Sequence, residues 1–238
     1  MEISRIDLNG VNCYLGKQDG KFILFDTGGH LTLDKKFDNR YDELLKWLET
    51  YGCTPENLKL IVLTHGDNDH VANALTLREQ FGAKIAIHEN DRDLVENPNI
   101  DMMMKSFKYR SILFKLVFLV MNKQIRKITL KALDEYNKHG KFTPDIYLSD
   151  GDSLSEYGFD AQVIHLPGHT AGSIGIWTDG HDLIAGDIFT DIRKPETAPN
   201  AVNFKQLSES VRKIKTYQIN KVYPGHGIPF TFDRFYKK

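Results

Sequence analysis

The apolar and polar positions change period several times along the chain, and the sharpest change lies just after residue 60. Leu58 to Leu63 is a short apolar run rich in branched residues, which is typical of a buried strand. Val71 to Phe81 has apolar residues at helical spacing, and Gly82 then favours a helix end. Polar residues at the end of a strand lie at one sheet edge, where open α/β sheets place their sites. Between the predicted strand and helix stand four candidate metal ligands: His65, Asp67, Asp69 and His70.

Strand and helix patterns alternate in the remainder of the chain as well. Asp19-Gly20 favours the tight turn of a β-hairpin, because both turn positions want a positive φ. Apolar residues at helical spacing predict helices over Phe37 to Gly52 and Phe204 to Tyr217. The second half of the chain contains four further predicted strands: Ala161 to Leu166, Ile174 to Thr178, Asp182 to Ala185 and Lys221 to Tyr223.

The segment from Met102 to Lys131 is both strongly apolar and basic. It has no acidic residue and eight basic ones: Lys105, Lys108, Arg110, Lys115, Lys123, Arg126, Lys127 and Lys131. Its composition predicts a helical pair or one long helix, inserted at about residues 100–143. Three interpretations stay open: a lid over the substrate, a homodimerisation surface, or a helix that lies on a membrane surface.

Five short motifs, in order along the chain, resemble the signature of the metallo-β-lactamase superfamily. They are Phe25-Asp26-Thr27-Gly28, His65 to His70, His165 to Ser173, Ala185-Gly186-Asp187 and Tyr223 to Gly227. One residue departs from that pattern, because Asp67 stands where the family has its second motif histidine. The resemblance implies a single α/β domain over residues 1–238, a four-layer αβ/βα sandwich with a helical insert, and a site in the cleft between the sheet edges.

The resemblance also implies seven metal ligands and two supporting residues. The first metal would be bound by His65, Asp67 and His169. The second would be bound by Asp69, His70 and His226, with Asp187 bridging both ions. Asp26 would support the metal loop through hydrogen bonds, and His165 would lie near the site without binding metal. Asp69 is in addition the candidate for a catalytic role, since it can accept or relay a proton in this family.

Two divalent metal ions would make a nucleophile at neutral pH. A water that bridges them loses a proton readily, and the ions polarise a carbonyl or phosphoryl oxygen. Imidazole and carboxylate suit zinc, iron and manganese. Asp67 replaces a nitrogen ligand by a hard oxygen, which favours manganese or iron relative to zinc.

These features favour a hydrolase in which a metal-bridged hydroxide attacks a small ester, lactone or thioester. A thioesterase resembling glyoxalase II would need that enzyme's additional C-terminal domain, so that particular activity is not expected. Two alternatives remain. One is a phosphodiesterase, whose anionic substrate the basic insert would attract. The other is a non-catalytic protein that holds metal and either binds a ligand or has a regulatory role.

Composition narrows the choice of partners. The formal net charge of -1 argues against a nucleic-acid binder, and the N-terminus lacks the pattern of a signal peptide. The longest apolar run, Ile112 to Met121, contains Lys115 and is too short to span a bilayer. Cys13 and Cys53 are expected to be reduced, packed thiols. We therefore expect a cytoplasmic protein with a small-molecule substrate.

Overall fold

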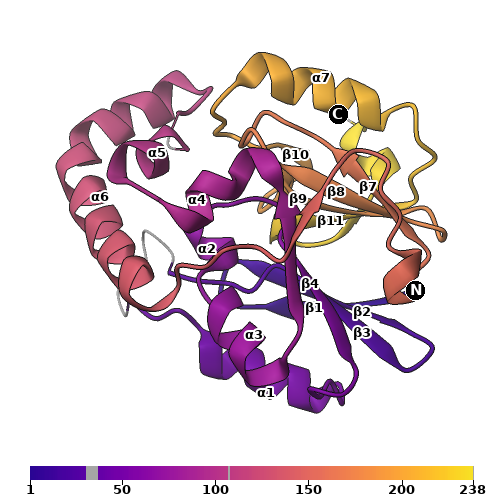
Figure 1. The fold of residues 1–238 in the computed structure, drawn as a ribbon. Helices are drawn as coiled ribbons and strands as arrows, with labels where there is room; N and C mark the ends of the chain where they lie inside the picture. The colour runs from indigo at the N-terminus through magenta and orange to yellow at the C-terminus, as the bar shows by residue number, and fades with distance from the viewer. Residues whose placement is uncertain (31–36, 107, 238) are drawn as a thin grey trace.

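The computed structural model describes residues 1–30, 37–106 and 108–237, and two six-stranded sheets form its centre (Figure 1). The first sheet has the order β1-β2-β3-β4-β5-β6. Neighbours are antiparallel from β1 to β3 and parallel from β3 to β6. Its strands are β1 (Glu2–Asp7), β2 (Asn12–Gln18), β3 (Lys21–Phe25), β4 (Leu58–Val62), β5 (Lys84–His88) and β6 (Ile146–Leu148).

The second sheet has the order β12-β11-β9-β8-β7, and β10 pairs with β9 beside that path. The central pair β9 and β11 is parallel, and its register shifts where β11 passes Pro224. The strands are β7 (Ala161–His165), β8 (Ile174–Thr178), β9 (Asp182–Asp191), β10 (Glu196–Thr197), β11 (Lys221–Gly227) and β12 (Phe230–Thr231).

The helices of the described residues either cover the outer face of a sheet or lie beside the sheets (Figure 1). They are α1 (Tyr41–Thr50), α2 (Asn68–Val71), α3 (Ala74–Phe81), α4 (Arg92–Glu96), α5 (Ile100–Lys105), α6 (Ile112–His139) and α7 (Phe204–Ile214). Single 3-10 turns span residues 89–91, 155–157 and 232–235. Among the residues that the structure describes, no helix is long and apolar enough to cross a membrane.

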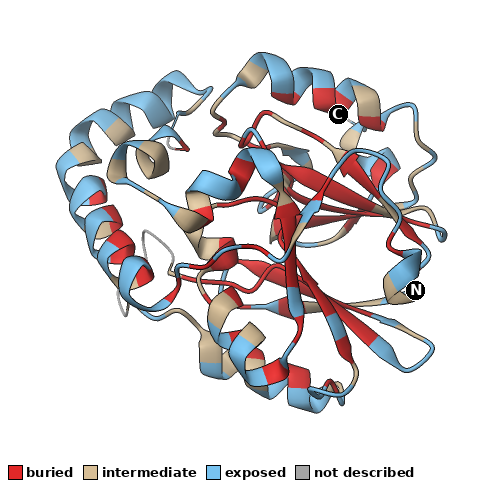
Figure 2. Cartoon of the chain, in the orientation of Figure 1, coloured by how far each residue is buried: buried red, intermediate tan, exposed pale blue. Residues whose placement is uncertain are grey.

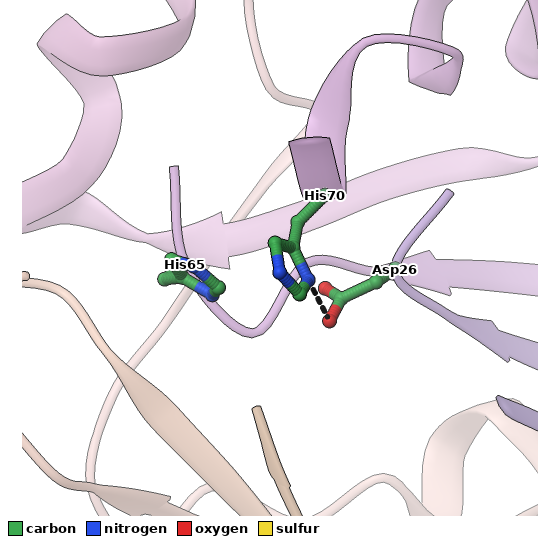
Figure 3. Close-up of side chains that lie close together, drawn as sticks. All are labelled: Asp26, His65 and His70. Atoms are coloured by element: carbon green, nitrogen blue, oxygen red, sulfur yellow. Dashed lines mark hydrogen bonds and ion pairs between the residues drawn. The ribbon is translucent and has the colours of Figure 1, made fainter. Parts of the chain in front are cut away.

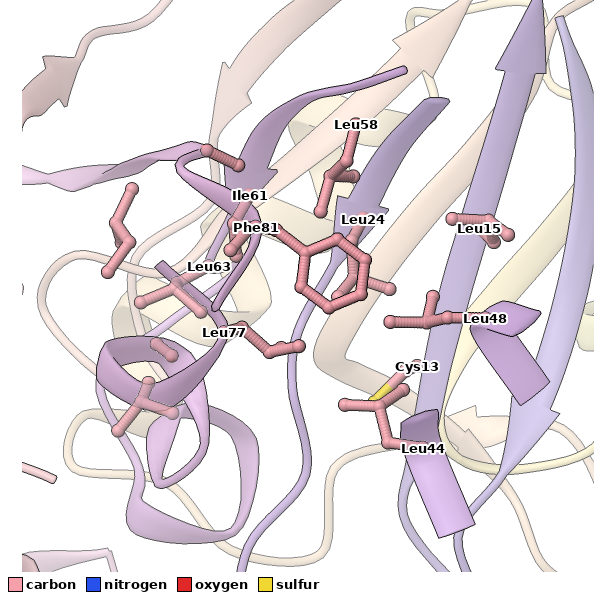
Figure 4. Packing of buried hydrophobic residues seen from close by; sticks show 14 of the residues in the cluster. Cys13, Leu15, Leu24, Leu44, Leu48, Leu58, Ile61, Leu63, Leu77 and Phe81 are labelled. Carbon is pink, nitrogen blue, oxygen red and sulfur yellow. The ribbon is translucent and has the colours of Figure 1, made fainter. Parts of the chain in front are cut away.

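Three apolar clusters define the layers. One packs the first sheet against α1 and α3, through residues such as Leu24, Leu48 and Leu77 (Figure 4). A second fills the space between the two sheets, and a third packs the second sheet against α7. Burial is concentrated on the strands (Figure 2). The predicted four-layer αβ/βα sandwich is therefore confirmed.

Several predicted boundaries were wrong. The last predicted strand continues from Tyr223 to Gly227, and the helix expected from Val71 begins at Ala74. The helix expected from Phe37 begins at Tyr41, because Phe37 and Arg40 have positive φ values of 51° and 62°, which an α-helix excludes. The strand expected to end at Ala185 continues to Asp191, because it pairs along its length with β11. The polar residues in its second half concealed that continuation in the sequence.

Candidate metal centre

The loop that follows β4 is held by a buried carboxylate from the next strand of the sheet. Asp26, at the end of β3, accepts hydrogen bonds from the Thr64 backbone N–H at 2.7 Å and the Thr64 hydroxyl at 2.8 Å. Its Oδ2 also lies 3.0 Å from Nδ1 of His70 on α2 (Figure 3). Asp26 contacts Nδ1 of the imidazole, whereas Nε2 faces Asp69 and Asp187. Asp26, His65 and His70 also offer donor atoms within 4.8 Å of one another, so the supporting role expected for Asp26 stays a prediction.

One group of three side chains matches the ligands expected for the first metal. A nitrogen of His65, an oxygen of Asp67 and a nitrogen of His169 all lie within 4.8 Å of one another. The shortest of these approaches joins His169 Nε2 and Asp67 Oδ2 at 3.0 Å. His169 stands in the loop after β7, 102 residues from Asp67. The fold thus brings the two loops together at the edges of different sheets.

A second group matches the ligands expected for the second metal. Donor atoms of Asp69, His70 and His226 also lie within 4.8 Å of one another. Asp69 and His70 come from α2, and His226 comes from β11. His226 Nε2 is 3.5 Å from Asp69 Oδ2 and 3.5 Å from His70 Nε2.

Asp187 lies between the two groups. Its Oδ2 is 3.6 Å from His169 Nε2 of the first group and 3.2 Å from His226 Nε2 of the second. Its Oδ1 is 3.5 Å from His70 Nε2. Gly225 packs so closely against this carboxylate that an added Cβ would overlap both Asp187 Oδ1 and His70 Cε1. All seven predicted ligands therefore lie together, with Asp187 in the central position.

Each of the four imidazoles is oriented by a partner at Nδ1. His65 Nδ1 lies 3.0 Å from the Thr64 hydroxyl, and His70 Nδ1 contacts Asp26. The backbone carbonyls of Asn200 and Gly10 accept from Nδ1 of His169 and His226 respectively. Every Nε2 is thereby left facing the carboxylates. Ligand histidines in proteins usually have such partners on their other nitrogen, and the partners fix the tautomer and the ring orientation.

Buried charges shift the pKa values of the cluster strongly. Burial opposes the charging of His70, but the neighbouring carboxylates, Asp187 first among them, outweigh it and raise its pKa to about 10. The same balance raises the pKa of His169 and of His226 to about 9. Burial lowers the pKa of His65 to about 4. Without a metal, protons on three imidazoles would compensate the carboxylates.

The donor set suits divalent cations. Four imidazoles and three carboxylates converge, and both kinds of ligand bind zinc, iron and manganese. Within the described ranges, two buried atoms of the cluster have no hydrogen-bond partner: His65 Nε2 and Asp187 Oδ1. Buried polar atoms without partners are rare in proteins, and cation binding would satisfy both.

Asp91, which the sequence interpretation did not single out, connects the two loops that carry the first group. Its buried carboxylate accepts from the Gly66 N–H at 2.9 Å, the Gly172 N–H at 2.7 Å and the Thr170 hydroxyl at 2.6 Å. The only sequence sign was its position just beyond β5, close to the same sheet edge. Nothing in its spacing indicated contacts to residues about 80 positions away.

His165 lies beside the site and outside both ligand groups. Its Nε2 is 2.9 Å from the Ala171 carbonyl oxygen, in the loop that carries His169. Its ring stacks on His88, with the centroids 3.9 Å apart. These contacts are compatible with the packing or supporting role expected from the sequence.

Part of this cluster of candidate ligands lines one side of a cavity of about 800 Å³, here called its floor. Its floor contains Asp67, Asp69, His169, Asp187 and His226. One wall comes from α6 and Tyr109. Another comes from the end of β9 and the loop beyond it. The α6 wall is apolar and contains Phe114, Val117, Phe118, Met121 and Ile125. Ser106, at the end of α5, donates its hydroxyl to Asp67 at 2.9 Å.

Residues 6–226 match the metallo-beta-lactamase superfamily, and the chain belongs to that family. The five motifs that carry the ligand cluster fall within the matched residues, apart from the final Gly227.

Several relatives carry the names of hydrolases. Hydroxyacylglutathione hydrolase GloC of Haemophilus influenzae is 32% identical over 121 residues, 50% of this chain and 43% of that protein. The probable metallo-hydrolase YflN of Bacillus subtilis is 25% identical over 193 residues, 75% of this chain and 67% of that protein. The chain spans about half the length of the two hydroxyacylglutathione hydrolases that it matches, 43% and 56%.

Solved structures share the fold. The B3 metallo-beta-lactamase BLEG-1 superposes with a TM-score of 0.69 at 20% identity, over 100% of this chain and 97% of that one. The di-iron-bound form of TTHA1623 gives a TM-score of 0.62 at 22% identity, over 97% of this chain and 94% of that one.

Proposed function

We propose that this chain is a dinuclear metal-dependent hydrolase that acts on a small ester, lactone or thioester with an apolar acyl group. One observation carries the proposal: five of the seven clustered ligands line the floor of a cavity whose α6 wall is apolar. A floor that binds cations and a wall that excludes water suit a substrate with a polar reacting group at one end and an apolar group at the other.

The roles of the individual side chains follow from their positions. His65, Asp67 and His169 would hold one ion, Asp69, His70 and His226 the other, and Asp187 both. When bound, the two ions would acidify a water and polarise the oxygen of the group under attack. Asp26 keeps the His70 ring in place through its contact to Nδ1.

Asp69 is the candidate for proton transfer. It lines the cavity, and its Oδ2 lies 3.5 Å from His226 Nε2. Burial raises the pKa of its carboxyl group, and the negative charges of Asp187 and Asp67 act in the same direction. A carboxylate at the cavity floor, next to the two proposed ions, is well placed to take a proton and to deliver it to a leaving group.

The cavity lining favours this substrate class over a phosphodiester. A phosphodiesterase was expected to use the basic residues of the 102–131 segment to attract its substrate. The residues that this segment contributes to the cavity are instead apolar, aromatic or a serine, with no lysine or arginine among those described. The names of the relatives agree with hydrolysis, and the Haemophilus influenzae protein carries the name of a thioester-cleaving enzyme.

A substrate panel tests the proposal. Purified protein, loaded in turn with manganese, iron and zinc, is incubated with p-nitrophenyl esters of increasing chain length, lactones, a hydroxyacylglutathione thioester and bis-p-nitrophenyl phosphate. We expect turnover of at least one carboxylic acid derivative, with kcat/KM rising with acyl length. Turnover of the phosphodiester alone would contradict the substrate class, and no turnover with any metal would favour a non-catalytic role.

Variants separate the site from contaminating activity. Asp187→Asn and His169→Ala remove a central and a terminal ligand, and each is expected to reduce kcat/KM by more than about a hundredfold. His139→Ala is the matched control, because His139 is exposed at the end of α6 and lies outside the cavity. Equal activity in all three variants would assign the turnover to another protein in the preparation.

A further inference from the structure

The first half of α6 has two apolar faces. One face lines the cavity over the metal cluster. The other is solvent-exposed, and Figure 2 colours nearly all of this half of the helix as exposed. This outer face consists of Ile112, Leu113, Leu116, Leu119 and Val120, whose exposed fractions are 75%, 67%, 56%, 71% and 85%. The spacing places these residues on adjoining stripes of the helix.

Such a face is unusual on a soluble protein. Exposed apolar residues normally stand singly, and a contiguous group of them marks an interaction site. The second half of α6 is different, because Ile125, Leu133 and Tyr136 are buried against the body of the protein. Apart from Leu130, the exposed large apolar residues of α6 thus lie within residues 112–120.

The segment that contains this face is rich in cations. The segment from 102 to 131 has eight basic residues and no acidic one, while the formal net charge of the whole chain is -1. The other residues therefore carry a net charge of -9, and the positive charge is concentrated in this segment. In the part of the chain that the structure describes, Asp101 is the one carboxylate within 4.0 Å of these cations, at 3.5 Å from Arg126 in an exposed pair.

The positive charge of this segment indicates which kind of partner would bind the exposed apolar face of α6. A second copy of this chain that packed symmetrically on the same face would place the same cations opposite one another, because a two-fold interface pairs a patch with itself. An anionic lipid surface offers what the face lacks: negative phosphates for the lysines and an acyl boundary for the leucines. No described helix could span the bilayer, so this one would lie along it.

We propose that residues 112–123 of α6 dock this protein on an anionic phospholipid bilayer. The side chains of Leu116, Leu119 and Val120 enter the headgroup boundary, and Lys115 and Lys123 contact lipid phosphates. The opposite face of the same helical turns lines the cavity. Docking therefore brings the cavity next to the membrane, from which an apolar substrate can enter.

Vesicle flotation of the full chain tests this. Vesicles of phosphatidylcholine alone are compared with vesicles that contain phosphatidylglycerol in addition. We expect the protein to float with the anionic vesicles, less at high salt, and to stay behind with the neutral ones. Equal recovery with both kinds of vesicle, or with neither, would overturn the proposal.

Paired variants test the residues. Leu119→Gln with Val120→Gln removes apolar contact, and Lys115→Gln with Lys123→Gln removes charge, so each pair is expected to lower the partition coefficient at least roughly tenfold. These side chains are exposed, and unchanged thermal unfolding confirms that each variant folds. Trp47→Gln is the control, because Trp47 is 37% exposed on α1, which lies far from the start of α6 in Figure 1. Undiminished flotation of both pairs would overturn the proposal.

Size-exclusion chromatography of the same proteins tests the other possible partner of this face, a second copy of the chain. A wild type that is dimeric, does not float and becomes monomeric in the Leu119→Gln and Val120→Gln variant would assign the face to a second copy and overturn the membrane proposal. Because flotation needs no catalysis, its outcome is independent of the proposed hydrolase activity.

Discussion

Thr170 donates its hydroxyl hydrogen to Asp91 Oδ2 at 2.6 Å, and the same oxygen accepts from the backbone N–H of Gly66. Gly66 follows His65 directly, and Thr170 follows His169 directly. One buried carboxylate therefore fixes the spacing between two loops that each present a ligand of the first group. Asp91 acts through these loops and does not face the cluster, so its role is one of positioning.

Replacing Asp91 by Ala should weaken both the fold and the first metal site. The change leaves the buried N–H groups of Gly66 and Gly172 without an acceptor and removes one of the two partners of the Thr170 hydroxyl, which we expect to cost roughly 2–5 kcal/mol of unfolding free energy. At temperatures where the variant is folded, the affinity for the ion expected at His65, Asp67 and His169 should fall about 10- to 100-fold. Calorimetric titration with the metal measures this affinity.

The matched control for that experiment is Asp93→Ala, since Asp93 is exposed two residues away. It should leave both stability and metal affinity close to the wild type. A folded Asp91→Ala protein with normal metal affinity would show that Asp91 serves stability alone.

Replacing Asp67 by His should shift the metal preference toward zinc. The change substitutes a borderline nitrogen for a hard oxygen ligand and restores the motif residue of the superfamily. We expect the ratio of zinc to manganese bound in competition to rise at least about tenfold. A wild type that already holds two zinc ions tightly, with no change in the variant, would refute the influence assigned to Asp67.

Metal binding should release protons from the imidazoles. Carboxylates raise the pKa of His70 to about 10 and those of His169 and His226 to about 9 in the metal-free protein. At pH 7.5 these three rings are therefore protonated, and a metal ion must displace the proton from each Nε2 it binds. About three protons per chain should appear in a weakly buffered titration with an indicator dye.

The same reasoning gives the pH dependence of metal affinity. Since the rings lose their protons only as the pH approaches 9, apparent affinity should keep rising between pH 7 and pH 9. His65 contributes nothing to this, because burial lowers its pKa to about 4 and leaves it neutral. Release of less than one proton, with an affinity that does not change with pH, would contradict the charge balance described for the site.

His88 should make the fold sensitive to mild acid. Burial and the adjacent His165 lower the pKa of His88 to about 4, and its Nδ1 accepts from the Asn90 N–H at 3.1 Å. In the unfolded chain this imidazole binds a proton near pH 6.5, whereas in the folded protein it does so only near pH 4. The contribution of neutral His88 to the unfolding free energy is therefore complete above pH 6.5 and is lost as the pH falls toward 4. Protonation also removes the acceptor from the turn that follows β5.

His88→Asn tests this effect, since Asn can accept the same hydrogen bond without titrating. Urea unfolding at pH 7 and pH 5 should show the wild type losing more stability than His88→Asn. His139→Asn, at an exposed histidine, should follow the wild type. Parallel pH dependence of wild type and His88→Asn would exclude His88 as the group responsible.

The seven candidate ligands could be proposed from the sequence because each lies in a short motif that follows a strand or forms part of one. His65, His169 and His226 lie far apart in the chain, yet the strands that deliver them end at neighbouring sheet edges, which is a property of the fold class. The resemblance of these motifs to a known pattern supplied the grouping, and the structure brings the same seven side chains together. Their role as metal ligands stays a prediction.

The supporting contacts could not be predicted in the same way. Asp91, Asn200 and Gly10 act through backbone groups or through loops that pack only in the tertiary structure. No period or spacing encodes such contacts. The first half of α6 was correctly expected to be helical and apolar, but its two opposite apolar faces became visible only once the cavity had been located.

The metal content of the purified chain tests the central claim most directly. After reconstitution and removal of free metal, elemental analysis of the wild type should give two divalent ions per chain. Asp187→Asn, which changes the residue placed between both groups, should give one ion or none while remaining folded. A wild type without stoichiometric metal, or an Asp187→Asn protein that still holds two ions as tightly, would contradict the dinuclear site.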